Sequence, residues 1–357
     1  MKPVYDLLGP EGYGAYEVTW KESGPKFKRV SKPPQGILTP GFVDLHIHGA
    51  FGIDFMSASL PQMLELAEKL AEVGYEAFLP TTITATADDV LAATDRLPAH
   101  EMMPGFHLEG PFISPHHPGA QPPPAIQSPS MRAERWSVVL QDPRLRLITL
   151  APEVPGGLAL ISELRRPGLT VSMGHTDATY DEARAGFEFG VSHVTHTFNA
   201  MRRFHHREAG AVGYALQNDA LTTEIIYDRH HVAREAASLL FRCRPAEKIV
   251  AVSDSTQATG LAEGAEIELW GQPAVVGEKC VHLRDTKTLA GSAVTLLDCF
   301  QNLAEDFGPE TAIRCCCLNP RTVLGNLQPR VWLEFDRAFN LLRRLDKNGE
   351  PVTPPSG

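Results

Sequence analysis

"PGFVDLHIHG", residues 40–49, places two histidines two positions apart at the end of an apolar, strand-like run. Side chains of a strand alternate between its two faces, so His46 and His48 share one face and Leu45 and Ile47 lie on the other. We expect the aliphatic pair to face surrounding helices while the imidazoles converge inside the fold. The H-x-H pattern alone leaves two interpretations open, polar residues of a half-buried strand or metal ligands.

Further strand-like runs follow, separated by helix-like patterns. They occupy residues 75–83, 105–110, 146–153, 169–176, 192–200, 222–228 and 248–255. Eight strands that alternate with helices over roughly 250 residues predict an α/β fold, a (β/α)₈ barrel of the TIM type. A doubly wound open sheet is the alternative, but no glycine-rich dinucleotide turn follows the first strand.

The helix-like stretch 59–74 carries the expected start and stop signals. Ser59 and Pro61 stand at its beginning and Gly74 at its end. Its apolar residues recur at helical spacing, which predicts a helix packed against the strands.

The two ends of the chain differ from the part between them. Residues 1–36 and 326–357 are rich in turns and short strand-like runs, and we predict that they pair into a small β domain beside a barrel formed by residues 37–325. Segment 262–284 is predicted to be an inserted hairpin. The proline-rich segment 114–126 is predicted to be a long loop after the third strand, where loops often cover active sites.

Composition excludes several classes of protein. The chain has 357 residues, 43% hydrophobic and 21% charged, which is ordinary for a globular protein. It has no apolar run of 18 residues and no secretory signal pattern, so we expect neither a membrane span nor secretion, but a cytoplasmic location. The net charge is 33 − 43 = −10, which argues against nucleic acid as a partner but allows a small phosphorylated ligand.

Cysteine usage points to reduced thiols. Of the 6 cysteines, Cys315, Cys316 and Cys317 are consecutive. Adjacent helical residues point in different directions and make a poor zinc site. We therefore expect reduced cysteines in a helix.

Polar side chains stand where the predicted strands end, which is where TIM barrels carry their reactive groups. They are His46, His48, Glu109, His175, His196 and Asp254. This set offers nitrogen and oxygen ligands without thiolates, which suits Zn²⁺ and also Fe²⁺, Co²⁺ or Mn²⁺. The set as a whole favours the metal interpretation of the two histidines.

Seven motifs in a fixed order carry a resemblance to a known family. They are "PGFVDLHIHG", "HLEGPF" (107–112), "MGHTDA" (173–178), "HTFNAM" (196–201), "HREAGAVG" (206–213), "SDS" (253–255) and "LAGS" (289–292). On these the chain resembles the amidohydrolase superfamily and, within it, the N-acetylglucosamine-6-phosphate deacetylase family. The resemblance implies metal-dependent hydrolysis of the N-acetyl group of N-acetylglucosamine 6-phosphate, giving glucosamine 6-phosphate and acetate.

The resemblance also implies roles for individual residues. Glu109, His175 and His196 match the ligands of the metal site that members share, and His46 and His48 match a second site that only some members fill. One or two metal ions per subunit are thus implied, and Zn²⁺ is the first expectation. Asp254 matches the catalytic aspartate.

The implied substrate-binding residues come from four segments. They are Gly119, Ala120 and Gln121; Asn199, Ala200 and Arg207; His231; and Leu289 and Ala290. Asn199, the backbone of Ala200 and Arg207 match phosphate-binding positions, and His231 matches a histidine that contacts a substrate hydroxyl. Arg207 is expected to reach into the neighbouring subunit's site, which implies a homodimer.

One departure from the family pattern keeps other substrates open. The family usually has a histidine where this chain has Gln121, and glutamine donates a hydrogen bond but carries no positive charge. The alternatives are a deacetylase for a related amino sugar such as the galactosamine epimer, a deacetylase for an N-acyl amino acid, or a non-catalytic barrel that binds sugar phosphates.

Polar residues outside the motifs have ordinary interpretations as well. His107 shares a face with Glu109 and is a candidate for orienting a ligand, whereas His193 is interpreted as structural. Asp44 precedes the H-x-H motif and either supports it or is a satisfied core residue. Asp177 and Asp228 are interpreted as loop or cap residues.

Overall fold

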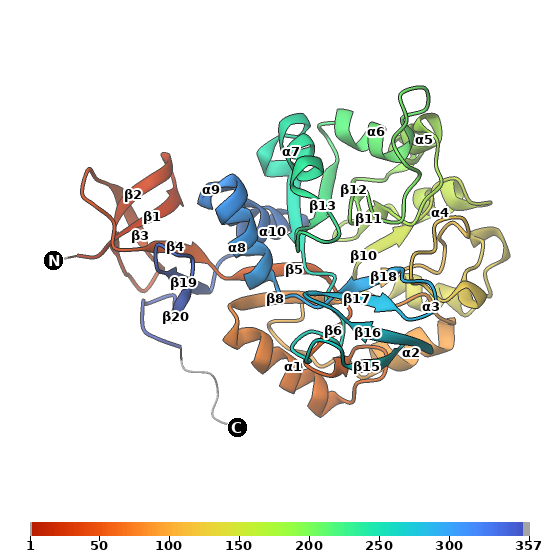
Figure 1. The fold of residues 1–357 in the computed structure, drawn as a ribbon, viewed down its shortest axis with the longest axis horizontal. Helices are drawn as coiled ribbons and strands as arrows, with labels where there is room; N and C mark the ends of the chain where they lie inside the picture. Colours follow the sequence, from red (N-terminus) through yellow and green to blue (C-terminus); the bar gives the residue numbers. More distant parts are fainter. Residues whose placement is uncertain (1, 353–357) are drawn as a thin grey trace.

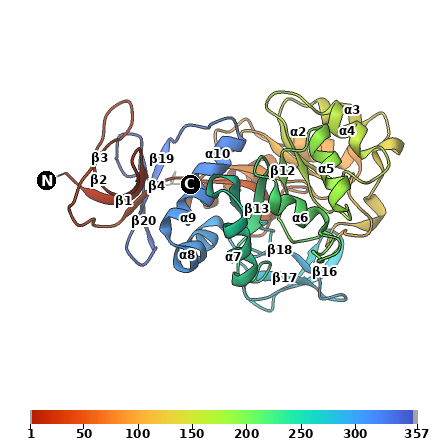
Figure 2. The same ribbon diagram turned by 90° about the horizontal axis from the view of Figure 1, so that it is seen from above.

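The computed structural model describes residues 2–352 (Figures 1 and 2), so Met1 and residues 353–357 of the expected end domain lie outside the described residues. A six-stranded parallel sheet has the order β14-β13-β12-β11-β10-β9, and a separate parallel pair is formed by β5 and β8. The bounds are β5 (Phe42–Ile47), β8 (Tyr75–Pro80), β9 (Phe106–Glu109), β10 (Leu145–Leu150), β11 (Thr170–Met173), β12 (His193–Val194), β13 (Thr222–Ile226) and β14 (Ile249–Val252).

Two parallel bridges connect the pair to the larger sheet. Thr81, just beyond β8, bridges to His107 of β9, and Ile47 of β5 bridges to Ser255, just beyond β14. Each predicted strand-like run overlaps one of these parallel strands, which confirms the α/β architecture and is consistent with a TIM-like barrel. The run 192–200 is strand only at His193–Val194, because residues 195–200 turn away to form a loop.

Helices follow most of the parallel strands. They are α1 (Leu60–Glu72), α2 (Ala87–Asp95), α3 (Trp136–Gln141), α4 (Gly157–Glu163), α5 (Tyr180–Phe189), α6 (Gly210–Gln217), α7 (Arg234–Cys243), α8 (Leu296–Phe307), α9 (Pro309–Ile313) and α10 (Asn319–Val323). The prediction for 59–74 is confirmed: Ser59 caps α1 through a capping box with Gln62, and Gly74 follows the helix with φ +96°.

The prediction for Leu45 is wrong because the pairing of β5 with β8 is irregular. The register shifts between Asp44 and Ile47, which breaks the strict alternation of side chains. Leu45 packs with Val43 and with apolar residues of β8, β10, β13 and β14 instead of facing the helices. Asp44 accepts hydrogen bonds from the Tyr75 hydroxyl at 3.2 Å and the His46 backbone at 3.2 Å.

Both chain ends contribute to a second sheet, of order β20-β19-β4-β1-β2-β3, which lies at the left of Figure 1. Its strands are β1 (Val4–Gly9), β2 (Gly12–Thr19), β3 (Lys26–Arg29), β4 (Ile37–Pro40), β19 (Val331–Phe335) and β20 (Leu341–Asp346). Tyr5, Tyr16, Leu38, Trp332 and Leu345 belong to one buried cluster, so residues from both ends share a core.

The segment between β14 and α8 forms a four-stranded antiparallel sheet rather than the predicted hairpin. We call it the insertion sheet; it comprises β15 (Glu266–Leu269), β16 (Gln272–Val276), β17 (Cys280–Leu283) and β18 (Leu289–Ser292). The fourth strand was not expected, because "LAGS" is too short and too rich in small residues to show a strand pattern. A two-stranded pair, β6 (Gly49–Ala50) and β7 (Ile53–Asp54), precedes α1.

The cysteines are free in the structure, as expected. Cys315, Cys316 and Cys317 are buried in a π-helical turn, η4 (Arg314–Leu318). Three-residue 3₁₀ turns occur at η1 (Pro123–Ala125), η2 (Pro129–Met131) and η3 (Ala246–Lys248). Among the described residues, no helix has the length and apolar character that crossing a membrane requires.

A buried ion pair joins Arg321 of α10 to Glu76 of β8, and the same carboxylate accepts from the backbone at the start of β19. Arg321 donates to both carboxylate oxygens of Glu76, at 3.2 and 2.7 Å, and to the backbone oxygen of Gly41 at 2.8 Å. Glu76 also accepts from the backbone nitrogens of Arg330 at 2.9 Å and Val331 at 3.3 Å, and it is only 1% exposed.

Substitution Arg321→Met is expected to destabilise the protein by about 3–5 kcal/mol, because it removes the main partner of a buried carboxylate. Urea unfolding of the variant measures this loss. Arg314→Met is the matched control, since Arg314 pairs with Glu310 at 2.8 Å near the surface and should contribute at most about 1 kcal/mol. Equal, small losses in both variants would contradict the importance of the buried pair.

Candidate active site

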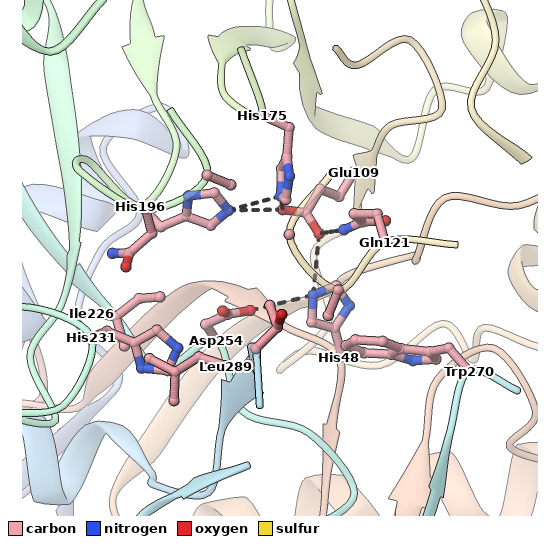
Figure 3. Close-up of a pocket in the computed structure, with 16 residues that line it drawn as sticks. His48, Glu109, Gln121, His175, His196, Ile226, His231, Asp254, Trp270 and Leu289 are labelled. Atoms are coloured by element: carbon pink, nitrogen blue, oxygen red, sulfur yellow. Dashed lines mark hydrogen bonds and ion pairs between the residues drawn. The ribbon is translucent and has the colours of Figure 1, made fainter. Parts of the chain in front are cut away.

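The predicted metal ligands form two buried groups beside one pocket, and Figure 3 labels all of them except His46. One group is Glu109, His175 and His196, and the other is His46, His48 and Asp254. Each group offers three ligand atoms that lie within 4.8 Å of one another. The residues follow or end β5, β9, β11, β12 and β14, so the carboxyl ends of the parallel strands bring them together.

The first group is organised around one carboxylate oxygen. Glu109 Oε1 lies 3.1 Å from His175 Nε2 and 3.2 Å from His196 Nε2. The two imidazole nitrogens lie 3.1 Å from each other. These three groups converge on a space small enough for a single ion.

The second group converges next to the first and shares contacts with it. His48 Nε2 lies 3.3 Å from His46 Nε2, 3.3 Å from Asp254 Oδ1 and 3.3 Å from Glu109 Oε2. His46 Nε2 lies 3.4 Å from Asp254 Oδ1 and 3.3 Å from Glu109 Oε1. Glu109 therefore stands between the two groups.

Hydrogen bonds at the far side of two rings determine which nitrogen faces the site. His48 Nδ1 lies 3.1 Å from the backbone oxygen of Thr81, and His175 Nδ1 lies 3.0 Å from that of His117. A carbonyl only accepts, so each Nδ1 carries a proton, and Nε2 is the nitrogen that faces the site and can bind an ion. Metal-bound histidines are held in this way.

A further buried carboxylate, Glu224, supports the histidines from behind. It accepts from His193 Nε2 at 2.9 Å and from the His196 backbone at 3.1 Å, and it lies 3.4 Å from His46 Nδ1. Burial alone would raise the pKa of Glu224, but the contacts with His193 and His46 hold it well below its usual range. Nothing in the sequence marks Glu224 as functional, because it is a single polar position inside an apolar strand.

The charges of the site favour a cation between the imidazoles. Burial alone would lower the pKa of His48, but Asp254 and Glu109 outweigh it and raise the pKa to about 9. Burial would raise the pKa of Asp254, but His46 and His48 hold it below its usual range. Ionised carboxylates that attract protons onto neighbouring imidazoles also attract a divalent ion, so the donor set fits a metal.

Three of the six residues in the two groups have backbone conformations that residues other than glycine rarely adopt. His175, His196 and Asp254 have φ values of 47°, 27° and 48°. Such conformations cost on the order of 1–3 kcal/mol each and tend to occur at functional sites. Each follows a short parallel strand, and the turn directs its side chain back over the end of the sheet.

Most of the predicted substrate-binding residues line the pocket above the two groups. They are Gly119, Ala120, Gln121, Asn199, Ala200, His231 and Leu289. Asn199 Nδ2 is buried and has no hydrogen-bond partner among the described residues. Ala290 is fully buried in the packing of the insertion sheet, between Leu289 and Gly291, which both line the pocket.

Arg207 lies elsewhere, exposed on a loop where its Nη1 lies 2.9 Å from His206 Nε2. It is not among the residues of this chain that line the pocket. The neighbouring loop residues His205 and His206 are exposed too, as are His116 and His230.

His231 is held by an aspartate that sequence reasoning treated as a cap. Asp228 Oδ2 lies 2.6 Å from His231 Nδ1, and Asp228 Oδ1 accepts from the His231 backbone at 2.7 Å. The bond fixes the ring so that Nε2 is the nitrogen free to meet a ligand. The sequence shows that Asp228 and His231 are three positions apart. It does not show the tight turn that brings the two side chains into contact.

Trp270 is a second residue that sequence reasoning missed. It comes from the turn between β15 and β16, lines the pocket, and lies with its ring centroid 5.1 Å from that of His48. Its Nε1 donates to Asp54 Oδ2 at 3.1 Å, which ties the insertion sheet to the β6–β7 pair. An aromatic ring beside imidazoles and carboxylates gives the pocket one apolar wall.

Two buried histidines behind the site have the contacts expected of supporting residues. His107 Nε2 lies 2.7 Å from Thr149 Oγ1, and His107 Nδ1 lies 3.1 Å from the Leu45 backbone oxygen. Burial lowers the pKa of His107 well below its usual value, so the ring is neutral. His193 contacts Glu224, as a structural histidine would.

Comparison with known proteins agrees with this site. The family described as "Amidohydrolase family" matches residues 37–326. N-acetylglucosamine-6-phosphate deacetylase of Bacillus subtilis (strain 168) is 35% identical over 80% of this chain and 74% of its own. N-acetylgalactosamine-6-phosphate deacetylase of Escherichia coli O157:H7 is 33% identical over 83% of this chain and 80% of its own.

Solved structures are similar over nearly the whole chain. N-acetylglucosamine-6-phosphate deacetylase of Thermotoga maritima matches with a TM-score of 0.88 and 28% identity, over 99% of both chains. An aspartate-to-alanine mutant of the Mycobacterium smegmatis deacetylase, in complex with N-acetyl-D-glucosamine-6-phosphate, matches with a TM-score of 0.87 and 26% identity, over 99% of this chain and 100% of that one. The chain therefore belongs to the amidohydrolase family, whose members are divalent-metal-dependent hydrolases.

Proposed function

We propose that this chain hydrolyses the N-acetyl group of N-acetylglucosamine 6-phosphate to glucosamine 6-phosphate and acetate. The observation that carries the proposal is the presence of Asp254 beside the Glu109–His175–His196 group in one pocket. Similar proteins that are named N-acetylglucosamine-6-phosphate deacetylase support the proposal. A bound divalent ion, with Zn²⁺ our first expectation, would polarise the amide carbonyl and lower the pKa of a water molecule.

Asp254 supplies the proton transfers. Its carboxylate is ionised in this site, so it takes a proton from the attacking water. It then returns that proton to the amine nitrogen as the carbon–nitrogen bond breaks, because an unprotonated amine is a poor leaving group. Water and the amide are thereby converted to acetate and the free amino sugar, with no serine or cysteine nucleophile.

Other pocket residues fit a phosphorylated sugar. The unpartnered Asn199 amide nitrogen is a donor suited to a phosphate oxygen, and the Ala200 backbone lies beside it. His231 Nε2 is placed to meet a sugar hydroxyl. We infer that Arg207 completes the phosphate site from the neighbouring subunit of a homodimer, because its own pocket does not include it. The dimer and a cytoplasmic location stay predictions.

We further propose that the two bridges close the eight parallel strands into a complete (β/α)₈ barrel. The sheet built from both chain ends would then be a separate small domain of residues 1–40 and 326–357. The boundary expected at residue 36 moves to residue 40, because β4 (Ile37–Pro40) pairs with β1 and β19 in that sheet. Residues of both chain ends share one buried cluster, and the sheet lies at one end of the molecule (Figure 1), which supports this division.

The proposed reaction predicts acetate release from N-acetylglucosamine 6-phosphate and much less from N-acetylglucosamine. Arg207→Ala is expected to lower kcat/KM for the phosphorylated sugar by about 10- to 100-fold, because hydrogen bonds to charged groups contribute about 1.5–3 kcal/mol. Arg203→Ala, an exposed arginine of the same loop, is the matched control. No acetate from the metal-replete protein would refute the proposal.

A second candidate substrate is N-acetylgalactosamine 6-phosphate, since a relative with that name is 33% identical to this chain. Gln121, in place of the family's usual histidine, adds a reason to test it. Comparing kcat/KM for the two epimers decides between them: a higher value for the galactosamine epimer would replace the first proposal. Acetate release from N-acyl amino acids alone would point to a different branch of the family.

A further inference from the structure

Gln121 is held at both ends of its carboxamide. Its Nε2 donates to Glu109 Oε2 at 2.5 Å, and its Oε1 accepts from the Thr84 backbone N–H at 2.7 Å. The side chain is only 4% exposed although it lines the pocket. A flipped amide would set its oxygen against a carboxylate and its NH₂ against a backbone N–H, so this orientation is fixed.

The two oxygens of Glu109 consequently have different surroundings. Oε1 faces the imidazoles of His175 and His196, at 3.1 and 3.2 Å, and also lies 3.3 Å from His46 Nε2 of the other group. Oε2 faces His48 at 3.3 Å and has one of its lone pairs occupied by the Gln121 N–H. Figure 3 shows Glu109 between these partners.

We propose that Gln121 is a positioning residue that makes the two metal groups unequal. It holds Oε1 of Glu109 on the side of His175 and His196, and it competes for Oε2 with an ion in the other group. An ion in the Glu109–His175–His196 group therefore binds tightly, and an ion in the His46–His48–Asp254 group binds more weakly. The inference rests on the metal sites of the proposed function and adds the cause of their difference.

A simpler role for Gln121, holding its loop in place, predicts something else. Gln272 also fastens this loop, because its Nε2 donates to the Ala120 backbone oxygen at 3.1 Å. It makes no hydrogen bond to Glu109. If loop anchoring were all that mattered, loss of either glutamine would affect the metal groups alike.

The test is Zn²⁺ affinity of metal-free protein, measured by competition with a chromophoric chelator. His48→Ala leaves the Glu109–His175–His196 group to be measured alone, and His175→Ala leaves the His46–His48–Asp254 group. Adding Gln121→Met, which has the length of glutamine without its hydrogen bonds, should weaken Zn²⁺ binding in the His48→Ala protein by about 10- to 100-fold. In the His175→Ala protein, the affinity should stay the same or rise.

Gln272→Met in the same two proteins is the control and should leave both affinities unchanged. The inference is overturned if Gln121→Met leaves the first affinity intact, weakens both groups equally, or has no more effect than Gln272→Met. Thermal unfolding checks that each variant folds, and Gln121→Leu, which also lacks the carboxamide, replaces Gln121→Met if that variant does not. Absence of Zn²⁺ binding in the unsubstituted chain would instead refute the proposed function.

Discussion

Acetate release should fall by about 10²- to 10⁴-fold when Asp254 is replaced by asparagine, because this is the usual contribution of a positioned general acid and base. The asparagine has nearly the same shape but cannot accept and return the proton. Steady-state kinetics with N-acetylglucosamine 6-phosphate measures the loss.

Binding separates this effect from a damaged site. Calorimetric titration of the Asp254→Asn protein with the substrate should show affinity close to the original, and Zn²⁺ should still occupy the Glu109–His175–His196 group. Asp142→Asn is the control. Asp142 precedes β10, at the end of the strand that lies away from the active site, and it pairs with Arg144 at 2.7 Å. Near-normal turnover by the Asp254 variant would disprove its role as proton carrier.

The second large effect is expected from His175→Ala. His175 supplies one of three ligand atoms in its group, and the other two cannot hold an ion with comparable affinity. We expect roughly one Zn²⁺ fewer per chain and a loss of acetate release of at least about 10³-fold, since polarisation of the amide and activation of water depend on that ion.

His48→Ala is the informative comparison and His230→Ala the control. If the His46–His48–Asp254 group holds a dispensable ion, His48→Ala should keep much of the activity, whereas exposed His230 should not matter. Treatment with a chelator should abolish activity, and back-titration with Zn²⁺, Fe²⁺, Co²⁺ or Mn²⁺ identifies the metal that restores it. Full activity in metal-free protein would exclude the proposed chemistry.

The sequence predicted the strands and the metal ligands well because their signals are local. Each ligand stands directly after or at the end of an apolar run, and parallel strands necessarily bring such positions to one edge. His46 and His48 were expected to converge, and their Nε2 atoms lie 3.3 Å apart. The alternation argument nevertheless failed for Leu45, because a register shift in β5 cannot be read from period-two spacing.

The residues that sequence reasoning missed depend on contacts between distant segments. Glu224 supports His46 across 178 positions of sequence, and Trp270 reaches Asp54 across 216. Neither stands in a motif, and each would be an ordinary core or loop residue if its partner were elsewhere. Arg207 is a different case, because it stands in a motif but lies outside the pocket of its own chain. The structure of one chain shows that Arg207 is exposed, but the site that it reaches depends on a second subunit.

The insertion sheet leaves and rejoins the parallel strands at one point. Ser255 bridges to Ser292, and the Ser292 backbone N–H donates to the Asp254 backbone oxygen at 2.7 Å. The excursion between them carries Trp270 and Leu289 to the pocket wall. Because the two ends of the insertion sheet are hydrogen-bonded to each other, a longer insertion costs little additional loop-closure entropy and leaves Asp254 in place. Evolution is thereby free to exchange this wall, and with it the fit for a sugar, independently of the machinery that cleaves the amide.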